Sequence, residues 1–120
     1  MSIIKNRVRL THYDMGRIEE ALNFIDQHYQ KQLNAEDLAL EVGLSKKKLE
    51  AGILKKTGFV THAYLLMVRV EKTKPLLAEN LRQIKEIATL AGFKNPSHYS
   101  QVFKKFTSLT PDEYRSKHAV

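Results

Sequence analysis

Apolar residues recur at helical spacing along most of this chain, and short polar stretches separate the segments that show it. An arm without a sustained period, over residues 1–13, precedes a first helix over about 14–30. Six more helices are expected at 35–42, 46–57, 61–79, about 83–91, 96–106 and 111–118. No segment shows convincing strand alternation, so the chain is predicted to be all-α with seven helices.

Residues typical of helix ends support these boundaries. Side chains whose oxygen atoms can accept from the amides of a first turn precede three of the helices, namely Asn34, Ser45 and Asn95. Gly43 and Gly58 follow helices and can take the left-handed conformation of a tight turn. Pro75 lies near the end of the helix over 61–79, so we expect it to kink or end that helix.

A segment near the middle of the chain is repeated about 49 residues further on. The first copy runs Asp37-Leu38-Ala39, Val42-Gly43-Leu44 and then Lys55-Lys56, and the second runs Glu86-Ile87-Ala88, Ala91-Gly92-Phe93 and then Lys104-Lys105. Each copy has the order helix, glycine turn, helix, which is typical of a helix-turn-helix unit. The residues expected to be buried are Leu38, Ala39, Val42, Leu44, Leu49 and Ile53 in the first copy, and Ile87, Ala88, Ala91, Phe93, Tyr99, Val102 and Phe103 in the second.

The repeat divides the chain into two helix-turn-helix subdomains, over 14–58 and 81–120, which a linker helix within 59–80 joins. The 19 residues of that helix span about 28 Å. Successive major grooves on one face of B-DNA lie roughly 34 Å apart. Two similar surfaces at this separation make duplex DNA the first partner to consider.

Charge is unevenly distributed along the chain, whose net charge is +7. Residues 1–42 hold five Lys and Arg against seven Asp and Glu, whereas residues 43–120 hold fifteen against six. A positive excess confined to the repeat favours a polyanionic partner, although charge alone does not separate DNA from RNA or anionic lipid. No apolar run approaches signal-peptide length or the roughly 18 residues of a membrane span, so we expect no targeting segment and no membrane contact.

Catalytic and metal-binding patterns find little support. The chain has no cysteine, which excludes disulfides, thiolate zinc sites and a cysteine nucleophile, and weakly favours a cytoplasmic setting. The five histidines are scattered, at positions 12, 28, 62, 98 and 118. We therefore expect no enzyme activity, no cofactor, no metal and no small-molecule site.

The second helix of each copy carries the polar residues that could meet DNA. On the first, Lys46, Lys47 and Lys48 could bind phosphates and Glu50 could accept from cytosine N4. On the second, the candidates for base contact are Asn95, Ser97, His98, Ser100 and Gln101, with Lys104 and Lys105 for the backbone. The alternative for each of these residues is an ordinary solvated surface.

Over about residues 14–117 the chain resembles the DNA-binding domain of the AraC/XylS family of bacterial transcription regulators. The most specific stretches are Ile84-Lys85-Glu86-Ile87-Ala88, Ala91-Gly92-Phe93, Ser97 to Phe106 and Thr110-Pro111-Asp112-Glu113-Tyr114-Arg115, and the first unit matches through Leu38-Ala39, Gly43-Leu44-Ser45, Leu49 and Lys55-Lys56-Thr57-Gly58. The resemblance implies that the helices over about 46–57 and 96–106 enter successive major grooves. Its base-facing positions would be Lys47, Glu50 and Ala51, then Pro96, Ser97, Ser100 and Gln101.

The resemblance also implies the wider setting of the protein. It predicts a transcription regulator in the bacterial cytoplasm, associated with the nucleoid, in which activation would come through contact with RNA polymerase and repression is the open alternative. The full set of expected DNA-binding residues is Ser45, Lys46, Lys47, Lys48, Glu50, Ala51, Lys55, Asn95, Pro96, Ser97, His98, Ser100, Gln101, Lys104 and Lys105. The chain is too short to hold an effector-binding domain as well, so it is either self-contained or the DNA-binding part of a longer regulator.

Departures from the family pattern occur in the first unit, in the linker helix and in the second unit. Gly52 lies inside the recognition helix of the first unit, the helix over 46–57. Glycine there lowers helix stability by about 1 kcal/mol relative to Ala, and it is expected to leave a packing gap. Leu66 and Met67 stand where arginines are common, and Ser108 stands where the second unit usually has Gly. We therefore expect the second unit to dominate specificity. The alternative is a protein-interaction module with only non-specific DNA affinity, since an exposed apolar stripe at Leu66 and Met67 would suit a partner.

Overall fold

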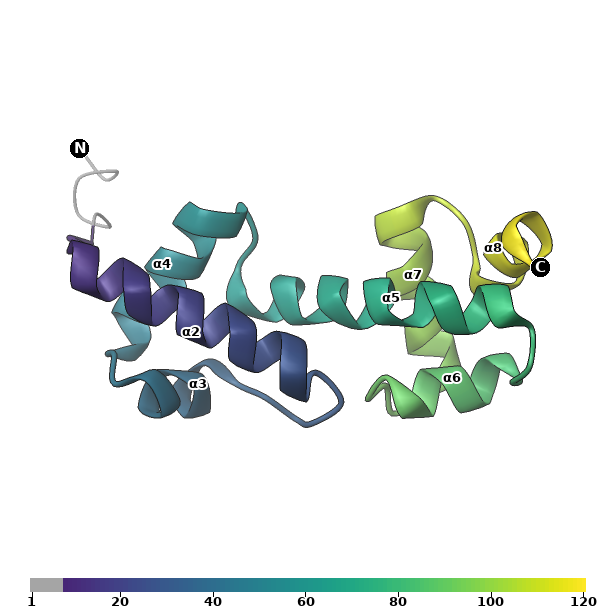
Figure 1. The fold of residues 1–120 in the computed structure, drawn as a ribbon, viewed down its shortest axis with the longest axis horizontal. Helices are drawn as coiled ribbons and strands as arrows, with labels where there is room; N and C mark the ends of the chain where they lie inside the picture. Colours follow the sequence, from purple (N-terminus) through teal and green to yellow (C-terminus); the bar gives the residue numbers. More distant parts are fainter. Residues whose placement is uncertain (1–7) are drawn as a thin grey trace. The chain divides into compact units, whose positions relative to one another are not determined.

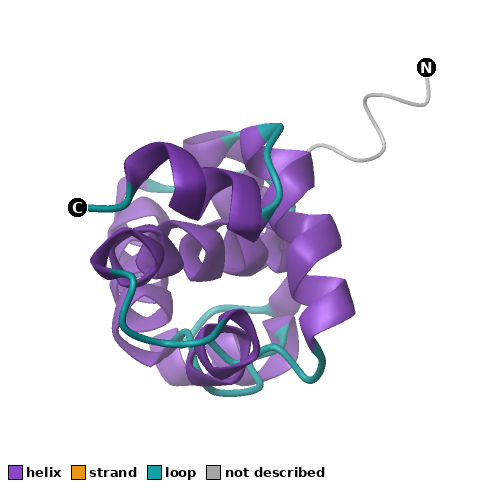
Figure 2. Cartoon of the chain, turned by 90° about the vertical axis from the view of Figure 1, so that its right-hand side faces the viewer, coloured by secondary structure: helices purple, strands orange, loops and turns teal. Residues whose placement is uncertain are grey.

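The computed structural model describes residues 8–120, which form α-helices joined by short loops (Figure 1). The helices are α2 (His12–His28), α3 (Ala35–Val42), α4 (Lys46–Thr57), α5 (Thr61–Glu79), α6 (Ile84–Leu90), α7 (Pro96–Thr107) and α8 (Pro111–His118). Over this described part there are seven helices and no strand (Figure 2). The predicted all-α fold is confirmed, and α5 has the predicted bounds.

Helix α2 begins earlier than predicted because a capping box starts it. The Asp14 backbone N donates to Thr11 Oγ1 at 3.0 Å, and the Thr11 backbone N donates to Asp14 Oδ2 at 2.9 Å. His12 and Tyr13 are therefore helical, which shortens the expected arm over 1–13. The first seven residues of that arm lie outside the described residues. At its other end α2 stops at His28 rather than at about residue 30.

The chain forms two compact units, and its helices do not divide between them as the sequence suggested. Unit 1 contains the chain up to Gln27 together with Leu33–Tyr64, and unit 2 contains His28–Gln32 and Leu65–Val120. The predicted division was 14–58, 59–80 and 81–120. Helix α5 runs from one unit into the other, because its first turn belongs to unit 1 and the rest belongs to unit 2.

The core of unit 1 is formed by one face of each of α2, α3 and α4, and α3 packs against α4. Its buried residues are Ile18, Ala21 and Ile25 of α2, Leu38, Ala39 and Val42 of α3, and Leu49, Gly52 and Ile53 of α4. The predicted core is confirmed except at Leu44, which is only half-buried. Arg17 Nε also donates to the Val42 carbonyl at 2.9 Å, so α2 satisfies an acceptor at the end of α3.

Gly52 leaves no packing gap, contrary to the expectation from the sequence. A Cβ atom placed on Gly52 would lie 2.4 Å from both Cδ1 and Cγ1 of Ile18. Ile18 is fully buried, so its side chain occupies the space that a larger residue on α4 would need. The glycine is therefore the small half of a complementary contact that lets α2 and α4 approach closely.

The core of unit 2 is built around α7. Its buried residues are Val70 and Leu77 of α5, Ile87 and Ala88 of α6, Ala91 and Phe93 of the turn, and Tyr99, Val102 and Phe103 of α7. This confirms the predicted core of the second copy. Leu66, Leu76, Phe106 and Tyr114 pack against the same cluster from its margin.

The segment His28–Gln32 is held in unit 2 by Arg69, which is 5% exposed. Arg69 Nε donates to the Tyr29 carbonyl at 2.7 Å, and Nη2 donates to the Lys31 carbonyl at 2.8 Å. The guanidinium carbon lies 5.7 Å from the centroid of the Phe93 ring. Gly92, with φ +96°, is required beside this contact because a Cβ there would lie 2.7 Å from the Gln30 carbonyl oxygen.

Pro75 does not end α5, which continues to Glu79. Packing holds the last turn in place, because Leu77 is fully buried and Leu76 lies against the core of unit 2. The final carbonyls also have donors, since Arg115 Nε donates to the Leu77 carbonyl at 3.1 Å and the Val120 N donates to the Ala78 carbonyl at 3.1 Å. These contacts compensate for the backbone hydrogen bond that Pro75 cannot donate within the helix.

Substituting Gly52 tests the contact with Ile18. Gly52→Ala is expected to lower the free energy of unfolding by about 1–3 kcal/mol, because the added methyl group overlaps a side chain that the core already confines. Gly16→Ala on α2 is the matched control, since nothing lies within 4 Å of its Cβ position. Helix propensity alone should make that control up to about 1 kcal/mol more stable. Chemical denaturation of both variants would contradict the assignment if Gly52→Ala were also stabilising.

Candidate nucleic-acid interface

The exposed face of α4 carries the side chains that were predicted to face bases in the first unit. At 3.6 residues per turn, Lys47, Glu50, Ala51 and Leu54 fall within an arc of about 100°. Lys47 and Glu50 are exposed, Ala51 is half-buried and Leu54 is 48% exposed. Sequence reasoning missed Leu54, although its spacing from Lys47 and Ala51 places it on the same face.

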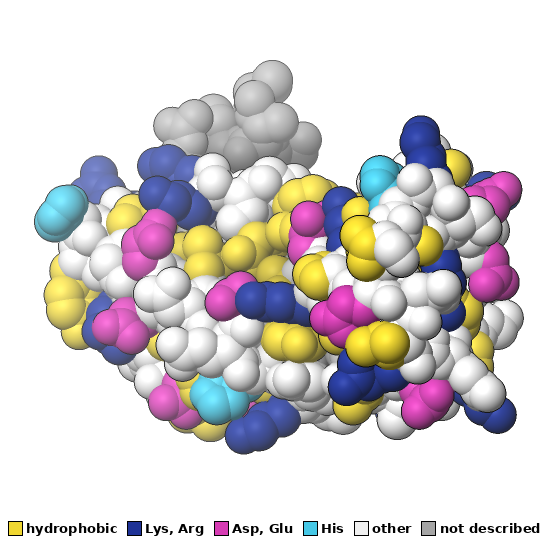
Figure 3. Space-filling model, turned by 45° about the vertical axis from the view of Figure 1, so that its right-hand side comes forward, with side chains coloured by type: hydrophobic (Ala, Val, Ile, Leu, Met, Phe, Trp, Pro, Cys, Tyr) yellow, Lys and Arg dark blue, Asp and Glu magenta, His cyan; other side chains and the backbone are white. Residues whose placement is uncertain are grey.

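Most lysines of α4 are paired with carboxylates of unit 1. Lys46 Nζ lies 3.0 Å from Glu36 Oε2, Lys48 Nζ lies 3.1 Å from Asp14 Oδ2, and Lys56 Nζ lies 2.9 Å from Glu19 Oε1. Glu36 raises the pKa of Lys46, and Lys46 in turn lowers the pKa of Glu36. For Lys47 and the exposed Lys55 no ion pair occurs among residues 8–120. On the face drawn in Figure 3, basic side chains lie beside acidic ones rather than in one unbroken area.

Asp14 connects the start of α2 to the start of α4. Its carboxylate accepts from the Thr11 backbone N and from Lys48, and the side chain is 6% exposed. The hydrogen bond from the Thr11 backbone, followed by that from Lys48, lowers the pKa of Asp14 below its ordinary value. Lys48 is therefore a positioning contact within unit 1, which leaves it less able to bind phosphate.

Helix α7 is fixed from beneath by a buried tyrosine. The Tyr99 hydroxyl donates to Thr73 Oγ1 of α5 at 2.8 Å, and the Thr73 hydroxyl donates to the Val70 carbonyl at 2.8 Å. Burial raises the pKa of Tyr99 to about 12, so the hydroxyl keeps the proton it donates. The Tyr99 ring also contacts Phe93 and Phe103, at centroid distances of 5.1 and 5.8 Å. These contacts set the rotation of α7 about its axis.

The outward face of α7 is polar and basic. Its exposed residues are Pro96, Ser97, His98, Gln101, Lys104 and Lys105, and Ser100 is half-buried. The ring of His98 lies edge-on against Phe93 at a centroid distance of 5.6 Å, which directs it toward the turn. Within the described part of the chain, neither Lys104 nor Lys105 forms an ion pair.

Two predicted interface residues are helix caps. Ser45 Oγ accepts from the Lys48 backbone N at 3.1 Å, and Asn95 Oδ1 accepts from the His98 backbone N at 2.7 Å. These bonds hold the side-chain oxygens at the first turns of α4 and α7. Their amide or hydroxyl hydrogens are still able to face a ligand.

The structure corrects the offset between the two copies of the repeat from the recognition helices α4 and α7 onward. From the turn glycine to the first residue of the next helix, the chain advances three residues in the first copy (Gly43 to Lys46) and four in the second (Gly92 to Pro96). Equivalent residues of α4 and α7 are therefore 50 apart and not 49. Thr57 and Thr107 show this directly, because their hydroxyls donate to the carbonyls of Ile53 and Phe103 at 2.7 and 2.8 Å. The residues that end the two helices, Gly58 and Ser108, are both left-handed, with φ 81° and 69°.

This register changes which residues correspond. Leu49 matches Tyr99 and Ile53 matches Phe103, and all four side chains are fully buried. On the outward face, Glu50 matches Ser100, Ala51 matches Gln101 and Leu54 matches Lys104. The two lysine pairs that suggested an offset of 49 are therefore not equivalent, because Lys55 corresponds to Lys105 and Lys56 to Phe106.

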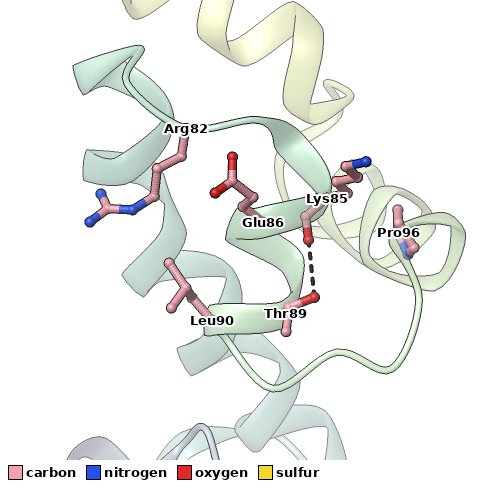
Figure 4. Close-up of a pocket in the computed structure, with 6 residues that line it drawn as sticks. All are labelled: Arg82, Lys85, Glu86, Thr89, Leu90 and Pro96. Carbon is pink, nitrogen blue, oxygen red and sulfur yellow. Dashed lines mark hydrogen bonds between the residues drawn. The ribbon is translucent and has the colours of Figure 1, made fainter.

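A pocket of about 620 Å³ lies on the exposed side of α6 (Figure 4). It is lined by Arg82, Lys85, Glu86, Thr89, Leu90 and Pro96. The Glu86 carboxylate accepts from the Gln83 backbone N at 3.0 Å in a capping box, and Thr89 Oγ1 donates to the Lys85 carbonyl at 3.1 Å. Nothing in the sequence pattern indicated this pocket, because its lining joins α6 to Pro96 across a turn.

Other kinds of site are not found in the part of the chain that the structure describes. Over residues 8–120 no group of three or more His, Asp or Glu side chains could hold a metal ion. None of the helices described above combines the length and apolar character needed to cross a membrane.

Comparisons with known proteins agree on one kind of domain. A family model described as a helix-turn-helix domain matches residues 38–117. The xylose operon regulatory protein of Escherichia coli strain K12 is 30% identical over 96 residues, which cover 80% of this chain and 24% of that protein. The chain thus spans about a quarter of that relative's length.

Solved structures show the same fold. The crystal structure of a transcriptional regulator from Chromobacterium violaceum, described as one of the AraC-type DNA-binding domain-containing proteins, superimposes with a TM-score of 0.81. It is 27% identical, with 87% of this chain and 93% of that chain covered. The DNA-binding domain of AdpA, solved in complex with a target DNA, gives a TM-score of 0.77 at 23% identity, over 83% of this chain and 90% of that one.

Acid should selectively weaken the contact made by Asp14. Because its pKa is lowered in the folded state, the carboxylate stabilises the fold at pH values above its ordinary pKa of 3.8, and this contribution is lost as the pH falls through the lowered pKa. Asp14→Asn should therefore be less stable than the wild type near neutral pH, and the difference should shrink below about pH 4.

Thermal unfolding between about pH 7 and pH 2 measures this difference. Glu20→Gln, at an exposed position in the interior of α2, is the control and should change stability little. A difference for Asp14→Asn that stayed constant across the whole range would contradict the role given to the carboxylate.

Proposed function

The chain belongs to the AraC-type helix-turn-helix family, and from this membership we propose that it binds specific duplex DNA sequences and regulates transcription. The observation that carries the proposal is the family match over residues 38–117, because it spans both helix-turn-helix copies. The fold that the chain shares with the AdpA domain is one that holds target DNA in that protein's structure. The surfaces of α4 and α7 described above supply the chemistry that such binding needs.

The recognition helices α4 and α7 each enter a major groove, and the two grooves are successive ones on a single duplex. On α7, Gln101 is suited to pair an adenine edge bidentately, and Ser97 and Ser100 can reach bases or phosphates. Lys104 and Lys105 bind the flanking backbone. On α4, Glu50 can accept from cytosine N4, while Lys47 and Lys55 are the lysines available for phosphates.

Unit 2 contributes most of the sequence specificity. The face of α7 offers uncharged hydrogen-bonding side chains and two lysines without internal ion pairs. In unit 1, by contrast, Lys46, Lys48 and Lys56 already have carboxylate partners. DNA would have to replace those pairs to gain the same counterion release, so the net contribution of these three lysines is small.

The biological role follows from this binding. The chain acts in transcription activation by binding DNA and contacting RNA polymerase, in the cytoplasm and on the nucleoid. It works by binding and has no catalytic role or cofactor. The relative from Escherichia coli is about four times longer than the matched segment.

The alternative of a protein-interaction module loses the apolar stripe that partly motivated it. Leu66 packs against the core of unit 2, and Met67 is half-buried, so these two residues do not form an exposed apolar stripe. Leu66 belongs to unit 2, whereas most of α2 belongs to unit 1. DNA binding is therefore the better supported function.

Selection of bound duplexes from a random pool tests the proposal. We expect two half-sites about one helical turn apart, with a sequence preference that random duplex does not satisfy. Affinity should fall steeply as salt rises, and Lys104→Ala should reduce the slope of log K against log salt by about 1. Weak binding to every duplex without an enriched motif would refute sequence-specific regulation.

Paired substitutions test the ranking of the two units. Gln101→Ala should cost about 1–3 kcal/mol at the base pair it reads and relax selectivity there. Glu50→Ala should change the selected sequence less, because its neighbours on α4 offer fewer hydrogen bonds. Affinities of both variants for the selected site and for single base-pair changes give the comparison. If Gln101→Ala left the preference unchanged while Glu50→Ala altered it, the ranking would be wrong.

A further inference from the structure

The outward face of α4 has an exposed leucine at its centre. Leu54 is 48% exposed, and it lies between the positions of Lys47, Glu50 and Ala51 in the helical arc. The buried Leu49 and Gly52 lie on the opposite side of the helix, so the core of unit 1 does not require an apolar residue at position 54. Ala51, one turn earlier and half-buried, extends the same apolar strip.

The second unit has a cation where the first has this leucine. Under the 50-residue register Leu54 corresponds to Lys104, which is exposed on α7. Lys104 suits a phosphate, whereas Leu54 can only offer apolar contact. Because Lys46 and Lys48 are drawn to Glu36 and Asp14, the centre of the α4 face is more apolar than its lysine content suggests.

We propose that Leu54, together with Ala51, reads a thymine through its 5-methyl group. Thymine is the only base that presents a methyl group in the major groove, and apolar side chains recognise it by direct contact. Glu50 lies on the same face, so the thymine stands next to a position where an acceptor can favour cytosine. The inference rests on the proposed function, since it requires α4 to enter a major groove.

Replacing thymine by uracil isolates this contact, because the two bases differ only in the methyl group. The full chain first selects its duplex from a random pool. Each thymine in the half-site bound by unit 1 is then changed singly to deoxyuridine, and affinities are measured at one salt concentration. We expect one such change to weaken binding about fourfold, the effect of leaving one methyl group unburied.

Variants then connect the methyl group to the leucine. Leu54→Ala should lower affinity for the thymine duplex to the level of the uracil duplex and so remove the difference between them. Leu54→Lys should remove the difference too, but it should raise affinity for all duplexes and steepen the salt dependence by about 1. Lys104→Ala should weaken both duplexes equally. Leu40→Ala, at a position of α3 that is 81% exposed, is the matched leucine control and should leave affinity and the thymine-to-uracil ratio unchanged.

The outcomes separate this inference from the proposed function. If selection enriches no motif, the proposed function fails and this inference fails with it. If a motif is enriched but unit 1's half-site contains no thymine, or no single uracil change weakens binding, only the inference is overturned. The same holds if Leu54→Ala keeps the wild-type ratio. Thermal unfolding of Leu54→Ala should show an intact fold, because the residue lies outside the core.

Discussion

Burial of the inner faces of α4 and α7 is the constraint on which the rest of this structure depends. Each helix has 12 residues, a length that is marginal for an isolated helix in water. Their stability must therefore come from the side that packs, through Leu49 and Ile53 in one unit and Tyr99 and Phe103 in the other. Because these positions are fixed, the residues that remain exposed are fixed as well. The residues of α4 and α7 that the cores do not bury therefore determine the chemistry of each proposed DNA-binding surface.

The two units bury the inner faces of these helices with different side chains. In unit 2 large aromatic side chains and a hydrogen bond from Tyr99 to Thr73 fill the space under α7. In unit 1 the space under α4 is narrow, and the Ile18 side chain can pack against the backbone of α4 only because position 52 is glycine. Ion pairs from Asp14 and Glu19 of α2 also join these two helices, and Glu36 of α3 pairs with Lys46 of α4. The same carboxylates reduce the charge that α4 can offer to an outside anion, so packing and binding are coupled in unit 1.

Much of the fold could be predicted from the sequence because its signals are local. Periodicity and caps such as Asn34, Ser45 and Asn95 defined the helices, and the buried positions of α7 followed from them. The errors arose where the deciding partner is distant in sequence or not apolar. The cap at Thr11 starts α2 before its apolar pattern begins. The role of Gly52 depends on Ile18, and the pairing of Lys48 depends on Asp14, which no pattern along the chain reveals. The pair of adjacent lysines in each copy suggests a repeat offset of 49 residues, whereas the buried positions of α4 and α7 show that the second copy has one inserted residue and an offset of 50.

Arg69 has a consequence for how this protein could be divided. Its guanidinium binds carbonyls of the segment His28–Gln32, which precedes α3 in the chain yet belongs to unit 2. The polypeptide therefore passes between the units after Gln27, after Gln32 and after Tyr64. A fragment cut at the start of α5 would keep every helix of the second repeat but leave a buried arginine without its acceptors. The repeats are two in sequence, but no single cut in the chain yields a complete second unit.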